Sequence, residues 1–162
     1  MASEKEVLEN LMCRALTGDG AHVTAEAVFS GLDWKLAGAP VDGAPHTLFQ
    51  LLNHVVYWQE WAVKWLDGRR PAAPKHASGS WPGGVSPANR REWEGAVSRL
   101  RKVLGELQLR ARQEDLFARR GKTSRVEMLR TIGSHTSYHV GQAAFLRRLL
   151  GAWPPPTGGI TW

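Results

Sequence analysis

The chain is poor in cysteine and in long apolar runs. Its single cysteine, Cys13, excludes an internal disulfide in this sequence of 162 residues. Cys13 falls in an early helical segment, where we expect a buried and unreactive thiol. No apolar run approaches the ~20 residues of a membrane span, and the first residues, Met-Ala-Ser-Glu-Lys-Glu, lack the apolar segment of a signal peptide. We therefore expect a cytoplasmic protein with no membrane partner.

The alternating pattern typical of β-strands is also nearly absent. Hydrophobic residues make up 43% of the chain and charged residues 22%, which is ordinary for a soluble globular protein. A chain of this length can bury one core without disulfides. The sequence thus predicts an all-α fold, a four-helix bundle, formed by one domain over residues 1–162.

Charge is unevenly distributed along the chain. The net charge is +6, but residues 1–67 carry −5 and residues 68–162 carry +11. Such an asymmetry is compatible with nucleic-acid binding. The basic residues are scattered, however, without a groove-reading motif or a regular interleaving of aromatic residues. A solvated helix surface is the preferred interpretation, and nucleic-acid binding is kept as an alternative.

Apolar spacing at i, i+3 and i+4 marks most of the helices. We expect helices over residues 4–16, 21–31, 47–67, 86–107 and 124–150, loops over 33–43 and 68–85, and a short piece over 109–117. Thr47 is a candidate N-cap, Ser86-Pro87 predicts another helix start, and Ser124 with Glu127 forms a capping-box pattern. The 18-residue connection after Asp67 is long enough to cross the length of the bundle. It therefore predicts an up-down-down-up order of the helices.

Three histidines are expected to meet inside this bundle. His135 and His139 are four residues apart on one helix face, so both imidazoles can reach one metal ion. His54 lies on the aromatic, core-facing stripe of the 47–67 helix. It is ~20 Å from the end of that helix, while His135 is ~17 Å into the last one. Antiparallel pairing of these two helices would place all three histidines at one level.

The chemistry of this group favours a metal site. Three buried imidazoles without a shared partner would leave polar atoms unsatisfied, at ~1–3 kcal/mol each. The stripes that carry them contain no cysteine, aspartate or glutamate, and three histidines without a fourth protein ligand form the arrangement typical of catalytic sites. Gln142, one turn beyond His139, is the candidate catalytic residue, since it could hydrogen-bond a ligand histidine or a bound water. The alternative is a buried polar residue that ties two helices together.

Several of these segments carry a resemblance to a known family. The motif His135-Thr-Ser-Tyr-His139-Val-Gly-Gln142, with the closing Leu146-Arg-Arg-Leu-Leu-Gly-Ala-Trp-Pro154, resembles that of the DinB/YfiT-like superfamily of metal-dependent enzymes. His54, the Pro45-His-Thr47 segment and the Trp81-Pro82 turn add to it. The resemblance implies an up-down-down-up bundle and a divalent metal, zinc or nickel, on the positions of His54, His135 and His139. It also implies a homodimer and, as in some branches, the use of a low-molecular-weight thiol.

The sequence therefore predicts a metal-dependent enzyme, a transferase or a hydrolase, that acts on a small molecule. The metal would lower the pKa of a bound water or thiol. Two alternatives remain at this point. One is a basic helical protein associated with nucleic acid, and the other is a module that holds a metal without turnover.

Overall fold

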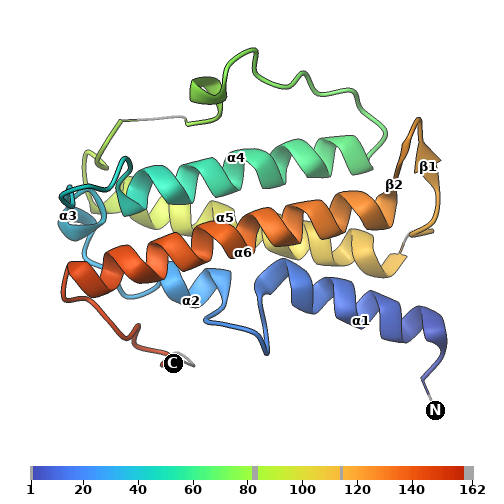
Figure 1. Ribbon diagram of the computed structural model, residues 1–162, viewed down its shortest axis with the longest axis horizontal. Coiled ribbons are helices and arrows are strands. Elements are labelled where there is room, and N and C mark those ends of the chain that lie inside the picture. Colours follow the sequence, from blue (N-terminus) through green and yellow to red (C-terminus); the bar gives the residue numbers. More distant parts are fainter. Residues whose placement is uncertain (1, 82–83, 114, 159–162) are drawn as a thin grey trace.

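The computed structural model describes residues 2–81, 84–113 and 115–158. Four long helices lie side by side: α1 (Glu4–Thr17), α4 (Leu48–Leu66), α5 (Arg90–Gln113) and α6 (Arg125–Leu149) (Figure 1). The shorter elements are α2 (Ala25–Phe29), α3 (Trp34–Ala37), a 3₁₀ turn η1 (Ala77–Ser80), and a two-residue hairpin of β1 (Arg119–Arg120) and β2 (Thr123–Ser124). The all-α prediction is confirmed.

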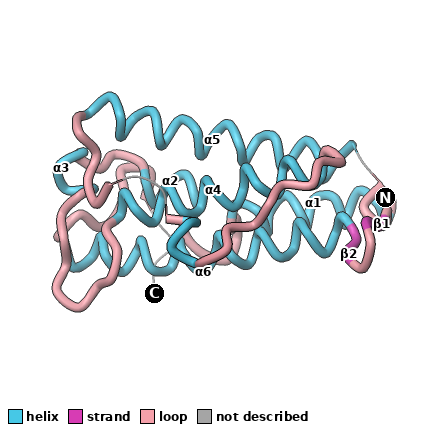
Figure 2. The backbone as a smooth tube through the Cα atoms, turned by 90° about the horizontal axis from the view of Figure 1, so that it is seen from above, coloured by secondary structure: helices cyan, strands magenta, loops and turns pink. Residues whose placement is uncertain are grey.

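Contacts between the long helices establish their directions. Helices α4 and α6 are antiparallel. Gln59 bonds Thr136, whereas Leu66, later in α4, accepts from Arg125, earlier in α6. Helices α4 and α5 run in the same direction, since ion pairs join Glu60 to Arg99 and Asp67 to Arg110. Figures 1 and 2 show α1 running in the direction of α6 and the α4–α5 connection returning along the bundle. The order is up-down-down-up, as expected.

Helix starts follow the local capping chemistry. Ser3, Thr47 and Ser124 each accept a hydrogen bond from the backbone N–H three residues later, and the side chain there accepts one in return. These capping boxes satisfy two of the N–H groups that the first turn of a helix leaves free. The predicted starts of α4 and α6 are confirmed.

The predicted start of α5 is wrong. The helix begins at Arg90 instead of Ser86, and Asn89 Oδ1 accepts from the Glu92 N–H at 3.0 Å. Ser86 is instead packed against the loop after α3, where a Cβ added to Gly38 would lie 2.2 Å from the Ser86 Cβ. Close packing between the two loops therefore keeps Ser86 and Pro87 out of the helix that their local preference favours.

Other boundaries also differ from the prediction. Helix α5 continues to Gln113, so the separate piece at 109–117 does not exist. The predicted helix 21–31 contracts to α2, because Thr24 Oγ1 caps it and glycines with positive φ precede and follow it. The predicted loops 33–43 and 68–85 contain α3 and η1, and Pro82 of the Trp81-Pro82 turn lies outside the described residues.

The hydrophobic core consists of two clusters. One joins α2 with the first halves of α4 and α5 and the last turns of α6. The other joins α1 with the second halves of α4 and α5 and the start of α6. Four buried polar residues, His54, Gln59, Thr136 and His139, lie between them on α4 and α6. The predicted level of the three histidines is therefore a polar layer in an otherwise apolar interior.

One buried cation fixes the end of α6 to the rest of the fold. Arg147 is 2% exposed, and its guanidinium donates to the carbonyls of Val28, Ser30 and Ala152 at 2.8–2.9 Å. Burial lowers the pKa of Arg147 from its ordinary value. These bonds hold the end of α2 and the turn after α6 in place.

None of the described helices is both long enough and apolar enough to cross a membrane.

Candidate metal centre

His54 projects from the middle of α4 and is 6% exposed. Its Nδ1 lies 2.7 Å from the carbonyl oxygen of Ser80, the last residue of η1. A carbonyl only accepts, so Nδ1 carries the proton and donates it. The Ser80 hydroxyl in turn donates to the Ala77 carbonyl at 2.6 Å, which holds the turn in shape. The Nε2 atom of His54 therefore presents its lone pair toward α6.

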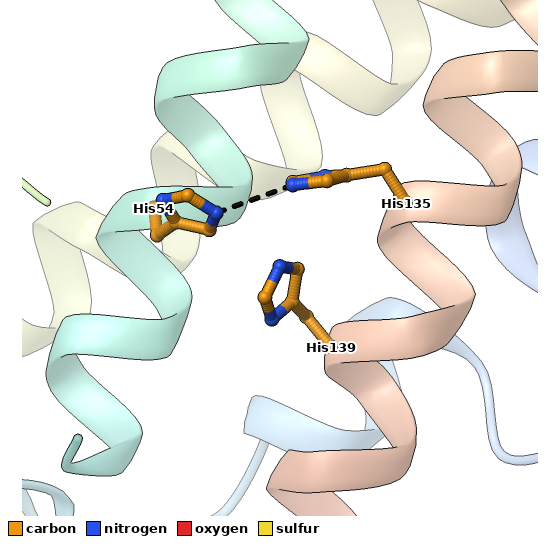
Figure 3. A group of neighbouring side chains, drawn as sticks. All are labelled: His54, His135 and His139. Carbon is orange, nitrogen blue, oxygen red and sulfur yellow. Dashed lines mark hydrogen bonds between the residues drawn. The ribbon is translucent and has the colours of Figure 1, made fainter. Parts of the chain in front are cut away.

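His135 and His139 project toward His54 from successive turns of α6 (Figure 3). His135 Nε2 lies 3.2 Å from His54 Nε2. The ring centroid of His139 is 4.7 Å from that of His54 and 4.5 Å from that of His135. One ligand atom of each histidine falls within 4.8 Å of the others. The structure thus brings together the three residues that the sequence selected.

Gln142 contacts this group through His139. Its Oε1 accepts a hydrogen bond from His139 Nδ1 at 2.7 Å, from one turn further along α6. The amide oxygen therefore fixes the proton of His139 on Nδ1 and leaves Nε2 free to bind a metal. Gln142 positions a candidate ligand in this way.

Burial keeps the three imidazoles neutral. Desolvation is the largest cause of a lowered pKa for His54, His135 and His139. The pKa of His135 falls to about 4, with the neighbouring His139 and His54 as further causes. The bonds to Ser80 and Gln142 oppose this effect on the other two rings. Metal ions bind neutral imidazole, so the group is in the required state at neutral pH.

The spacing of the nitrogens fits a divalent ion. Two nitrogens bound to tetrahedral zinc at ~2.05 Å would be about 3.3 Å apart, and His54 Nε2 and His135 Nε2 are separated by 3.2 Å. Among the described residues, no carboxylate or thiol joins the three histidines in this group. Glu26 and Glu94, the acidic side chains that α2 and α5 could have offered, are exposed. The described ligand set is neutral and has three members.

An aromatic stack on one side of the site was not predicted. The Trp81 ring lies on His54, with centroids 3.8 Å apart, and His46 lies on its other face at 3.6 Å. No sequence pattern assigns a role to His46, and Trp81 enters only through the family resemblance. Trp58, one turn after His54 on α4, makes a T-shaped contact with His135, with centroids 6.3 Å apart. Trp81 and Tyr138 also lie against His139, with centroids 5.9 and 5.0 Å apart, so aromatic rings contact all three histidines.

His22 contacts α6 through Ser137, on a face other than the one that carries His135 and His139. Its Nδ1 is 2.7 Å from the Val23 carbonyl, and its Nε2 accepts from the Ser137 hydroxyl at 2.9 Å. A Cβ on Gly18 would overlap this ring, at 2.1 Å from Cε1. The bond ties the segment after α1 to α6.

Comparison with known proteins gives one match. The model of the DinB superfamily matches residues 19–143, a stretch that contains the three histidines and Gln142. No curated protein and no solved structure matches the chain. The family match, the helical fold and a group of three histidines that could hold a metal agree with one another. The chain belongs to the DinB superfamily.

Proposed function

We propose that this chain is a metal-dependent enzyme, a transferase or a hydrolase, that holds one divalent ion through the Nε2 atoms of His54, His135 and His139. The supporting observation is that Nδ1, and not Nε2, carries the proton on two of the rings. Ser80 O and Gln142 Oε1 hold protons on the Nδ1 atoms of His54 and His139, so each Nε2 carries a lone pair. The lone pair of His54 Nε2 accepts from His135 Nε2 at 3.2 Å, a bond that a metal ion between the rings would replace. Imidazole ligands suit several divalent metals, and the family resemblance favours zinc or nickel among them.

Such an ion would supply Lewis acidity, lowering the pKa of a coordinated water or thiol so that a nucleophile is available near neutral pH. The protein contributes the environment. Its three ligands are neutral, so they leave the charge of the ion uncompensated and favour an anionic nucleophile beside it. Trp81 and Trp58 exclude water from parts of the site and strengthen the electrostatic interactions there.

The choice between water and a thiol as the nucleophile comes from the family resemblance. We propose a low-molecular-weight thiol as the co-substrate of a transferase reaction, with hydrolysis as the other outcome of the same site. The resemblance also leads us to expect a homodimer, which sedimentation velocity would measure. Nucleic acid is not the proposed partner.

Metal analysis of single variants tests the ligand set. Purified full-length protein, stripped with a chelator and reloaded with zinc, should hold one equivalent of metal. Replacing His54, His135 or His139 by alanine should remove most of it while circular dichroism still shows a helical protein. His76→Ala is the matched control, because His76 is an exposed histidine outside the group. If two of the three ligand variants keep a full equivalent, the ligand set is wrong.

Turnover is tested separately on the same zinc-loaded protein. A screen of thiols with electrophilic acceptors, and of simple esters with water, should show activity that His54→Ala loses and His76→Ala keeps. Full metal loading without any activity that depends on His54 would favour a metal-holding module.

A further inference from the structure

A pocket lies one helical turn from the three histidines. It occupies about 300 Å³ between the loop before α4 and the last turns of α6. Its apolar lining includes Leu51 and Leu146, which are buried, and Phe145 and Leu149, which are 61% and 54% exposed. The volume is at the lower end of the range for small-molecule sites.

Two residues connect this pocket to the metal centre. Gln142 lines the pocket and accepts the hydrogen bond of His139. His46 lines it as well and stacks on Trp81, which stacks on His54. The wall of the pocket therefore contacts the candidate ligand His139 directly and reaches the candidate ligand His54 through Trp81.

The amide nitrogen of Gln142 is available to a ligand. Its oxygen is used by His139, and none of the described residues accepts a hydrogen bond from its Nε2. An amide nitrogen carries two N–H donors, so it can bind a carbonyl or similar acceptor. Asp42, on the rim, disfavours groups with several negative charges.

We infer that this pocket binds the substrate: a compact, mainly apolar molecule with an uncharged acceptor such as an amide or ester carbonyl, which accepts from Gln142 Nε2. Phosphorylated molecules and nucleotides are excluded by the apolar lining and by Asp42. The inference rests on the proposed function for the reaction, but binding in the pocket can be measured without turnover. In this arrangement Gln142 joins the substrate and His139 through one amide group.

Phenylacetamide is a suitable probe, because it combines an apolar ring with an amide carbonyl. Its affinity for the zinc-loaded full chain, and for every variant, is measured by NMR titration that follows the signals of the probe. Phe145→Ser combined with Leu149→Ser should weaken binding tenfold or more (about 1.4 kcal/mol). Phe117→Ser is the matched control, since Phe117 is 69% exposed and does not line the pocket, and it should change nothing. Both replaced residues are largely exposed, so the double variant should still fold.

A second variant isolates the hydrogen bond. Gln142→Glu keeps an oxygen that accepts from His139 but has no N–H to donate. It should keep zinc and lose phenylacetamide affinity tenfold or more. Phenyl phosphate is compared on the zinc-free wild type, because the ion itself would bind a phosphate, and it should bind there at least tenfold more weakly than phenylacetamide.

The outcomes separate the pocket from the metal proposal. Phenylacetamide that binds equally well to the wild type and to the double variant, or to the wild type and to Gln142→Glu, would overturn the inference even in fully zinc-loaded protein. Binding that follows the expected pattern in a chain that holds no zinc would refute the proposed function and support the pocket. A double variant with a lower sedimentation coefficient, together with a wild type that does not bind the probe, would mean that a second copy covers this face, and the inference would be wrong.

Discussion

Acid should destabilise the metal-free protein through His135. The pKa of this imidazole is about 4 in the folded protein, against an ordinary value of 6.5. Because the folded value is the lower one, the unfolded chain binds a proton first as the pH falls. The contribution of His135 to stability is therefore complete above pH 6.5 and is lost progressively as the pH falls from 6.5 to about 4. The full pKa difference corresponds to about 3.4 kcal/mol, an upper bound. Solvent screening at this partly exposed ring reduces the expected loss to about 1–2 kcal/mol.

Urea denaturation of chelator-treated protein at pH 7, 5.5 and 4.5 would measure this loss. His54 and His139 also have lowered pKa values and contribute in the same direction, so the difference between wild type and His135→Asn is the informative quantity. The wild type should lose about 1–2 kcal/mol more than the variant between pH 7 and 4.5. His76→Ala should behave like the wild type. Equal losses in the wild type and in His135→Asn would refute the argument that burial of this imidazole controls the acid response.

Further predictions concern the support of the site and of the bundle. Gln142→Ala should weaken zinc binding by about 10–100-fold, since His139 loses the acceptor that orients it, and competition with a chromophoric chelator would measure this. Arg147→Met should lower the free energy of unfolding by about 2–4 kcal/mol in urea denaturation, because three carbonyls lose their shared donor. Gly133→Val should destabilise the protein by more than about 1 kcal/mol, since even a Cβ at this position would lie 2.9 Å from the Ala15 carbonyl oxygen; thermal unfolding would show a lower Tm. Binding to duplex DNA should be weak at physiological salt, whereas tight, sequence-selective binding by the metal-free protein would favour the nucleic-acid alternative.

The ligand geometry could be predicted because it depends on regular helices. The i, i+4 spacing of His135 and His139 places both on one face of any α-helix. The level of His54 follows from the rise per residue, once Thr47 and Ser124 mark the helix starts. Helix spacing, rise and capping depend only on local sequence, and the structure confirms the predicted helix starts.

The surroundings of the site could not be predicted because they depend on tertiary contacts. Ser80 and Trp81 belong to a connection without apolar periodicity, so no pattern shows which backbone carbonyl meets His54. Ser86 has the preference of an N-cap, but packing against Gly38 overrides it. Leu149 follows Leu146 by three residues on α6, a spacing that predicts a buried side chain, yet Leu149 is 54% exposed.

The parallel arrangement of α4 and α5 requires a connection that returns along the whole bundle (Figure 2). On its way this connection delivers Ser80 and Trp81 to His54. The helices therefore determine where a metal can bind, while a segment outside the helical framework supplies the acceptor and the ring that adjust one of its ligands. Substitutions in this crossover could change metal affinity and access without repacking the core. The stability of the bundle and the surroundings of its three histidines can thus change independently of each other.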